Sequence, residues 1–313
     1  MRTTPPLPPR INLREVGPRD GLQIERPIPT AKKLELLELL VRSGLKRIEA
    51  TAFVSPRAVP AMADAHEIAA ALHQWPDVQW SALVASETGA HRALESGIRN
   101  LEYVVSAADG HSLANVKRTS AEALAGVARI ADLVHDAGGT CEVIVATAWD
   151  CPFDGPTPAD RVQHIAQEAV RQGADALCLG DTIGTATPLR VVHLLEAVRD
   201  IFPHLPVGLH MHNTRGAALA SILAAMQVDV VDIDASIGGL GGCPFAPGAS
   251  GNVPTEELVY LCEDMGVATG CDLNTLVEAA RFAQQAVDRP LPSGVLKAGG
   301  RPGYPTTNAP ATH

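Results

Sequence analysis

The segment PADRVQHIAQEAVRQGADALCLGDTIGTATPLRVVHLLEAVRDIF, residues 158–202, contains a helix pattern, a strand pattern and a second helix pattern in succession. Residues 158–173 start with a proline and end in Gly173, and residues 188–202 start with a proline again. Between them, ALCLGDT (176–182) is an apolar run of strand length. A strand set between two helices is the repeating unit of a parallel sheet covered by helices.

The same alternation extends over most of the 313 residues. Apolar runs of strand length are separated by amphipathic stretches of helix length. The strand candidates are INLREVG (11–17), RIEATAF (47–53), QWSALVA (79–85), NLEYVVSA (100–107), CEVIVATA (141–148), ALCLGDT (176–182), VGLHMHN (207–213) and VVDIDASI (230–237). Eight strand–helix units close a (β/α)8 barrel, so we predict an α/β fold of the TIM-barrel class. The alternative is an open doubly wound sheet, which is disfavoured because no G-x-G-x-x-G follows the first strand.

The remaining helix patterns set the domain limits. The other helix candidates are 32–44, 120–139, 254–266 and 272–287. The helix over 120–139 is expected to begin at a Ser120 cap, with Glu122 in its first turn, and to end at a glycine pair. The helix over 272–287 is expected to pack outside the barrel. The predicted parts are an irregular N-terminus (1–10), a TIM-barrel catalytic domain with a C-terminal helix (11–288) and an irregular tail (289–313).

The charge balance limits the partners. The chain has 25 Lys and Arg against 35 Asp and Glu, a formal net charge of −10. This argues against binding to nucleic acid or to an anionic membrane surface, because both need clustered cations. Apolar residues make up 46% and charged residues 19%, which excludes disorder for the bulk of the chain. No run reaches the roughly 18 consecutive apolar residues of a membrane span.

The cysteines and the N-terminus indicate the compartment. The six cysteines are Cys141, Cys151, Cys178, Cys243, Cys262 and Cys271. None forms a C-x-x-C pair, and a chain of this length does not depend on a disulfide framework. The N-terminal MRTTPPLPPR lacks the apolar region of a secretory signal. We therefore expect a reduced, cytoplasmic protein with Cys141, Cys178 and Cys262 in the core.

Polar residues follow the predicted strands at the ends where a barrel of this type places its active site. His210 and His212, in the seventh strand, are two residues apart and therefore point to the same face. Asp20, after the first strand, is the candidate carboxylate, and Asn252 is a candidate neutral oxygen if the glycine-rich segment folds back. Such a ligand set suits Mg2+, Mn2+ or another divalent first-row ion. The sequence thus favours a metal site over histidines that only hydrogen-bond within the barrel mouth.

Two further residues carry candidate chemistry. Cys243 lies in GGLGGCPFAPGASGN (238–252), a segment whose glycines allow movement and close approach to a ligand. With an ordinary thiol pKa of about 8.5, Cys243 could donate a proton or act as a nucleophile, and the alternative is a small core residue. Arg19 could hold a carbonyl or carboxylate oxygen that gains negative charge, and the alternative is a structural ion pair with Glu49 or Asp181.

Five motifs resemble those of the 3-hydroxy-3-methylglutaryl-CoA lyase family. They are GPRDGLQIE (17–25), EATAFVSPRAVPAMAD (49–64), LGDTIGTATP (179–188), HMHNTRGAALA (210–220) and GGLGGCPFAPGASGNVPTEELVY (238–260). The resemblance runs in order from about residue 11 to residue 288. The GGCPFAPGASGN segment is the most specific part. The RDG and H-x-H motifs are shared with a wider superfamily of metal-dependent TIM barrels, which includes Claisen-type synthases and some aldolases.

The resemblance implies a role for each matched residue. The implied ligands of Mg2+ or Mn2+ are Asp20, His210, His212 and Asn252. The implied catalytic residues are Arg19, Asp20, Glu49, Asp181, His210 and Cys243. The implied substrate-binding residues are Arg19, Gln23, Ser55 and Phe153, with the CoA moiety near Ser55–Arg57.

The reaction that the resemblance implies is a metal-dependent retro-Claisen cleavage. Hydroxymethylglutaryl-CoA would give acetyl-CoA and acetoacetate, in an enzyme that is often a homodimer. His210 or Asp20 would take the hydroxyl proton. Arg19 would stabilise the enolate oxygen, and Cys243 would protonate the enolate carbon.

The sequence departs from the family pattern at Asn213, which replaces an Asp, at Arg215, which replaces a Tyr, and at Phe153, which replaces a Tyr. The segment 106–119 also differs. A related 3-hydroxy-acyl-CoA, such as citramalyl-CoA or a longer branched glutaryl-CoA, is therefore an alternative substrate. A synthase or aldolase acting on a 2-keto acid and a non-enzymatic metal or acyl-CoA binding protein are further alternatives. Cys243 in its glycine-rich segment favours the lyase over both.

Overall fold

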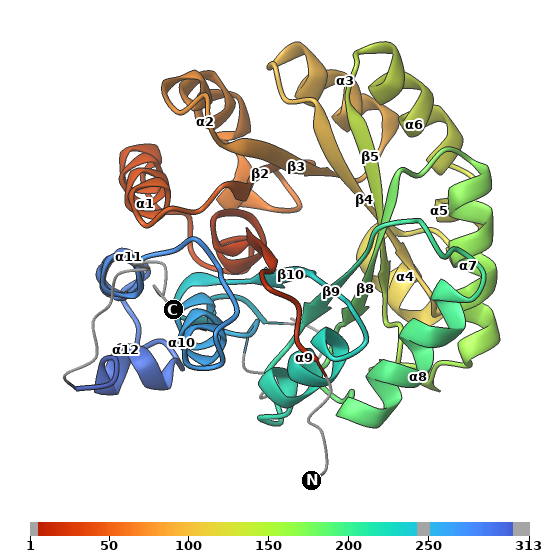
Figure 1. The fold of residues 1–313 in the computed structure, drawn as a ribbon. Helices are drawn as coiled ribbons and strands as arrows, with labels where there is room; N and C mark the ends of the chain where they lie inside the picture. The colour runs from red at the N-terminus through yellow and green to blue at the C-terminus, as the bar shows by residue number, and fades with distance from the viewer. Residues whose placement is uncertain (1–5, 243–250, 303–313) are drawn as a thin grey trace, which may run out of the picture.

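The computed structural model describes residues 6–242 and 251–302. Eight parallel strands close into a barrel in the order β1, β10, β9, β8, β5, β4, β3, β2 (Figure 1). These strands are β1 (Asn12–Glu15), β2 (Arg47–Phe53), β3 (Gln79–Val84), β4 (Asn100–Ser106), β5 (Thr140–Ala146), β8 (Ala176–Asp181), β9 (Val207–Met211) and β10 (Asp232–Ala235). Seven of them lie within a predicted strand or coincide with it, and β5 begins one residue before the predicted 141–148. The TIM-barrel prediction is confirmed, and the open doubly wound sheet is wrong.

Helices surround the barrel (Figure 1). They are α1 (Thr30–Arg42), α2 (Ala65–Ala71), α3 (Glu87–Glu95), α4 (Asp109–Val116), α5 (Ser120–Leu124), α6 (Val127–Asp136), α7 (Ala159–Arg171), α8 (Pro188–Arg199), α9 (Ala218–Met226), α10 (Thr255–Asp264), α11 (Leu273–Ala286) and α12 (Gly294–Ala298). Short elements between them are η1 (Gly17–Gly21), η2 (Pro60–Met62), η3 (Leu72–Gln74), η4 (Ile237–Gly239) and the hairpin of β6 (Asp150–Cys151) and β7 (Gly155–Pro156). Within the described part of the chain, no helix has both the length and the apolar content needed to cross a membrane.

The prediction of one helix over 120–139 is wrong, because α5 and α6 are separate helices. The cap is Thr119 rather than Ser120. The Thr119 side chain accepts from the Glu122 N–H and the Glu122 carboxylate accepts from the Thr119 N–H, which is a capping box. The break follows Leu124, and the carbonyl of the preceding Ala123 accepts a 2.9 Å hydrogen bond from the Tyr103 hydroxyl. That side chain thus competes for a carbonyl that a continuous helix would use internally.

The C-terminal segments also differ in part from the prediction. Helix α11 packs against α1 outside the barrel, as expected (Figure 1). The irregular tail predicted over 289–313 is wrong for Gly294–Ala298, which form α12. Ser293 caps this helix by accepting from the Leu296 N–H, and the Leu296 side chain is buried against the core.

The interior of the barrel is unusual because charged side chains occupy it. Branched apolar residues normally fill this space. Here Arg14 of β1 is buried in the middle, and its guanidinium donates to Asp234 at 2.7 and 2.9 Å, to Glu102 at 2.9 Å and to Glu142 at 2.6 Å. The apolar core instead lies largely between the strands and the helices, with residues such as Leu36, Leu40 and Ile48 fully buried. An ionic layer therefore links four strands from inside.

The cap of α11 gives a test of the fold. The Asp272 carboxylate accepts from the Thr275 N–H at 2.8 Å and from its hydroxyl at 2.7 Å. We expect Asp272→Ala to lower the free energy of unfolding by about 1 kcal/mol, measured by urea denaturation, because the first turn loses its cap. Asp272→Asn keeps an acceptor oxygen and should retain most of that stability. Equal losses in the two variants would contradict the capping role.

Candidate active site

The chain turns into the site immediately after β1. Gly17–Gly21 form a single π-helical turn, a rare element that concentrates at functional sites. The turn places Arg19 and Asp20 side by side, both buried, with Arg19 Nη1 2.7 Å from Asp20 Oδ1. A Cβ atom on Gly21 would lie 2.7 Å from the Cβ of Leu240, so only glycine allows the turn to pack against the start of the glycine-rich segment.

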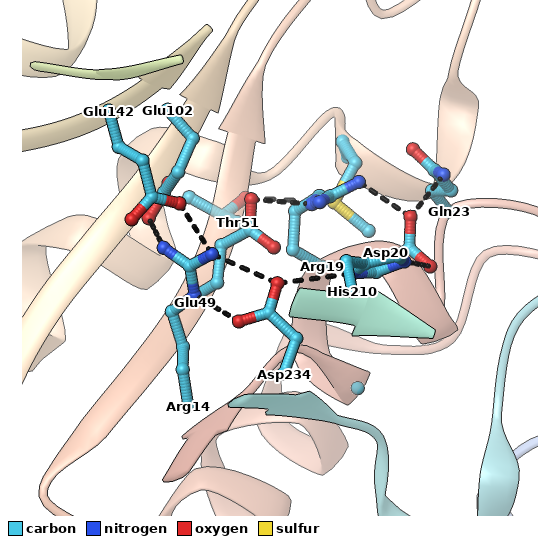
Figure 2. Close-up of polar contacts among 12 residues, drawn as sticks. Arg14, Arg19, Asp20, Gln23, Glu49, Thr51, Glu102, Glu142, His210 and Asp234 are labelled. Atoms are coloured by element: carbon cyan, nitrogen blue, oxygen red, sulfur yellow. Dashed lines mark hydrogen bonds and ion pairs between the residues drawn. The ribbon is translucent and has the colours of Figure 1, made fainter. Parts of the chain in front are cut away.

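Asp20, His210 and His212 form a candidate metal centre. One ligand atom from each of the three side chains lies within 4.8 Å of the other two. Asp20 Oδ2 is 3.8 Å from His210 Nε2 (Figure 2). Among the described residues, this is the one cluster of at least three His, Cys, Asp or Glu side chains close enough to share an ion. Two imidazoles and a carboxylate are a suitable donor set for a divalent first-row cation, so the residues fit the predicted group.

Asn252, the last residue of the glycine-rich segment 238–252, also lies at this cluster. Its backbone bridges to that of His212. Its side-chain nitrogen donates to Asp20 Oδ2 at 2.7 Å and to the Leu240 carbonyl at 3.0 Å. Because the nitrogen is engaged, the amide oxygen is the atom of Asn252 that can serve a cation. A Cβ on Gly241, whose φ is +113°, would lie 2.6 Å from that nitrogen, so glycine is needed here too.

Arg19 connects the cluster to the barrel interior. Its Nε lies 2.7 Å from Glu49 Oε1, and both side chains are buried. The sequence left open whether Arg19 pairs with Glu49 or with Asp181, and the structure shows the pair with Glu49. The β2–β3 register shifts between Glu49 and Thr51, and such irregularities re-aim side chains beside active sites. The guanidinium is fixed from two sides, by Glu49 and by Asp20.

Burial and neighbouring charge shift the pKa values of the site. Burial raises the pKa of Glu49 well above its usual range, although the Arg19 charge opposes the shift. Burial also acts to raise the pKa of Asp20, but Arg19 and the two histidines outweigh it and hold this pKa below its ordinary value. Burial and the neighbouring His210 lower the pKa of His212 to about 4. Asp20 is therefore ionised and His212 neutral at pH 7, which are the forms that bind a cation.

The other predicted residues fall into two groups. Gln23 joins the cluster, because its Nε2 donates to Asp20 Oδ1 at 2.9 Å. Asp181 does not join it. Its two carboxylate oxygens accept from the backbone N–H groups of Thr185 at 3.0 Å and Ala186 at 2.9 Å, so it orders the loop after β8.

Ser55 and Phe153 are exposed rather than enclosed. Ser55 follows β2, and its carbonyl accepts hydrogen bonds from the backbone N–H groups of Ala58 and Val59. Phe153 lies in the β6–β7 hairpin, and it is 51% exposed. Cys243 lies outside the described residues.

Sequence reasoning missed the buried acids and the arginine below the cluster. Asp234 accepts from His210 Nδ1 at 3.1 Å and from Arg14, which in turn contacts Glu102 and Glu142 (Figure 2). A signal was present, because each of these charged residues interrupts an apolar strand run. In a strand enclosed on both faces, a charged residue needs a partner inside the barrel.

Comparisons with known proteins agree with this arrangement. The family model described as HMGL-like matches residues 10–283. The (R)-citramalyl-CoA lyase of Chloroflexus aurantiacus is 41% identical over 94% of this chain and 96% of its own length. The hydroxymethylglutaryl-CoA lyase of Bacillus subtilis is 38% identical over 93% of this chain and 98% of its own.

A solved structure gives the same result. An HMG-CoA lyase from Acinetobacter baumannii, in complex with coenzyme A and 3-methylmalate, is 38% identical and superimposes with a TM-score of 0.90. The similarity covers 95% of this chain and 97% of that one.

A buried histidine of α4, which contacts the end of β4, gives a pH test. His111 Nδ1 lies 2.6 Å from the Ser106 hydroxyl, and burial lowers the pKa of His111 from 6.5 to about 4. The unfolded chain then takes up a proton at a higher pH than the folded one. Stability from this group is present above pH 6.5 and is lost as the pH falls towards 4, by up to roughly 1.4 kcal/mol per pH unit.

We expect His111→Asn to reduce that pH dependence in metal-free protein, measured by urea denaturation between pH 7 and pH 4.5. The exposed His164 provides a matched His164→Asn control, which should leave the slope unchanged. An unchanged slope in His111→Asn would show that His111 is not neutral in the folded protein.

Proposed function

The chain belongs to the HMGL-like family, and we propose that it is a metal-dependent carbon–carbon lyase that cleaves 3-hydroxy-3-methylglutaryl-CoA to acetyl-CoA and acetoacetate. The observation that supports this most strongly is the convergence of Asp20, His210 and His212, from distant parts of the sequence, within 4.8 Å at the carboxyl end of the barrel. Arg19 lies directly beside them.

In this proposal Asp20, His210, His212 and Asn252 hold Mg2+ or Mn2+. When bound, the cation would act as a Lewis acid that lowers the pKa of the tertiary hydroxyl of the substrate. The hydroxyl proton passes to Asp20, because His210 faces Asp234 with Nδ1 and uses Nε2 for the cation in this proposal.

The chain supplies the remaining steps. The bond between C2 and C3 breaks, and its electron pair forms the enolate of acetyl-CoA. The Arg19 guanidinium, fixed by Glu49 and Asp20, donates to the enolate oxygen as charge develops there. Cys243 then gives its proton to the enolate carbon, and its glycine-rich segment excludes water from that carbanion.

The second candidate is cleavage of (R)-citramalyl-CoA, since a relative with that activity is 41% identical. The two substrates share the methyl-bearing tertiary alcohol, the carboxylate and the thioester, and differ by one methylene. A pocket discriminates against one methylene by only about 1–3 kcal/mol, so family membership alone does not choose between them.

Two of the three departures from the family pattern have structural roles. Asn213 Oδ1 accepts from the Ala218 N–H at the start of α9, at 3.3 Å. Arg215 donates to the carbonyls of Ile183 and Gly184 and so closes the loop after β8. These contacts stabilise the barrel mouth, which supports reading both departures as tolerated variation. The proposal also includes CoA along the mouth near Ser55–Arg57, a homodimer and a cytoplasmic location.

The reaction can be tested with metal-stripped protein and a panel of 3-hydroxy-acyl-CoA substrates, following acetyl-CoA release. We expect no turnover without metal and restoration by Mg2+ or Mn2+. His212→Gln should lower kcat/KM by at least about 100-fold, because a ligand is lost, and His164→Gln on the surface should not. Turnover of citramalyl-CoA alone would select the second candidate. Inactivity on the whole panel, with condensation of a 2-keto acid and acetyl-CoA, would replace the lyase by a synthase.

The proton donor has its own test. We expect Cys243→Ala to lower kcat by about 100-fold to 10,000-fold while Mn2+ affinity stays unchanged, because only a proton-transfer group is removed. Cleavage at nearly the wild-type kcat would show that another group protonates the enolate.

A further inference from the structure

We propose that Asp234, held by Arg14, is a positioning residue that determines which ring nitrogen of His210 faces the cation. The inference rests on the metal role proposed above for His210. It concerns the barrel interior beneath the site, where Asp234 has no contact with the reacting atoms in the mechanism given above.

The contacts that carry the proposal surround one carboxylate. Asp234 Oδ2 lies 3.1 Å from His210 Nδ1. On its other side, Arg14 Nε donates to Oδ1 at 2.7 Å and Arg14 Nη2 donates to Oδ2 at 2.9 Å. Figure 2 shows Asp234 between the arginine and the histidine. Glu102 contacts Arg14 Nη1 and Glu142 contacts Arg14 Nη2, so the orientation of the guanidinium is fixed.

A carboxylate can only accept hydrogen bonds, so His210 must carry its proton on Nδ1 to make this contact. The lone pair of the neutral ring is then on Nε2, the nitrogen that lies 3.8 Å from Asp20 Oδ2 in the candidate metal centre. Asp234 thus presents the correct nitrogen to the cation before any ligand binds. Outer-shell carboxylates of this kind typically change metal affinity by about 10-fold to 100-fold.

The Arg14 fork makes an isosteric variant informative. In Asp234→Asn, one oxygen becomes an NH2 group, and both former oxygen positions face donors of Arg14. An amide oxygen at the Oδ2 position keeps the contacts with Arg14 Nη2 and His210 Nδ1 but turns the NH2 group against Arg14 Nε. The opposite orientation satisfies Arg14 Nε and directs the NH2 group at His210, whose ring then accepts on Nδ1 and carries its proton on Nε2. Because each orientation leaves a clash with Arg14, Asp234→Asn no longer fixes one tautomer, and the Nε2-protonated form cannot bind the cation through Nε2.

The experiment uses the full chain, metal-free and 15N-labelled at histidine. Two-bond 1H–15N correlation spectra report the tautomer, with the His210 signals assigned by their loss in His210→Gln. We expect the Nδ1-protonated form alone in the wild type and an additional population of the Nε2-protonated form in Asp234→Asn. Mn2+ affinity, measured by electron paramagnetic resonance, should fall by about 10-fold to 100-fold in the variant.

Asp232→Asn is the matched control. Asp232 lies on the same strand and the same face, two residues before Asp234, and pairs with Arg47 instead. It should leave both the His210 tautomer and the Mn2+ affinity unchanged. Equal effects of the two variants would overturn the proposal.

The wild-type spectrum is decisive even if Asp234→Asn does not fold. An Nε2-protonated His210 in the wild type would also overturn the proposal. If the wild type bound no Mn2+, the proposed metal function would fail, and the tautomers of the two proteins would still decide the role of Asp234.

Discussion

The buried guanidinium of Arg14 is the group on which the interior of this barrel depends. Three acids contact it, from β4, β5 and β10, and each of these charges would be costly to bury alone. The contacts join strands that lie on different sides of the barrel. The same network reaches the mouth, because Asp234 holds His210. The packing of the barrel and the geometry of the site therefore share one ionic layer.

Much of the fold could be predicted from the sequence because parallel strands enclosed on both faces appear as apolar runs, and the helices between them have clear starts and stops. The two wrong predictions, the single helix over 120–139 and the irregular tail over Gly294–Ala298, concern segments shaped by tertiary contacts. The Tyr103 hydroxyl takes a carbonyl at the point where the 120–139 helix breaks, and burial of Leu296 accompanies a short helix in a Pro/Gly-rich tail. Neither contact has a local sequence signal.

The candidate site was predictable to a similar extent. Strand periodicity placed His210 and His212 on one face, and the barrel topology brought Asp20 to them. Pattern reasoning could not separate Asp181 from Glu49, since both are acids within predicted strands. The structure separates them by their partners: Asp181 accepts from its own loop, and Glu49 pairs with Arg19. It also shows why Gly21 and Gly241 are needed, because a side chain at either would collide with the neighbours that align the ligands.

The central claim is that Asp20, His210, His212 and Asn252 bind one divalent cation. The most direct measurement is anomalous X-ray diffraction from crystals of the metal-stripped protein soaked with Mn2+. The account predicts one strong manganese peak between these four side chains, coordinated by Nε2 of His210. A peak elsewhere, or no peak at a saturating Mn2+ concentration, would contradict it.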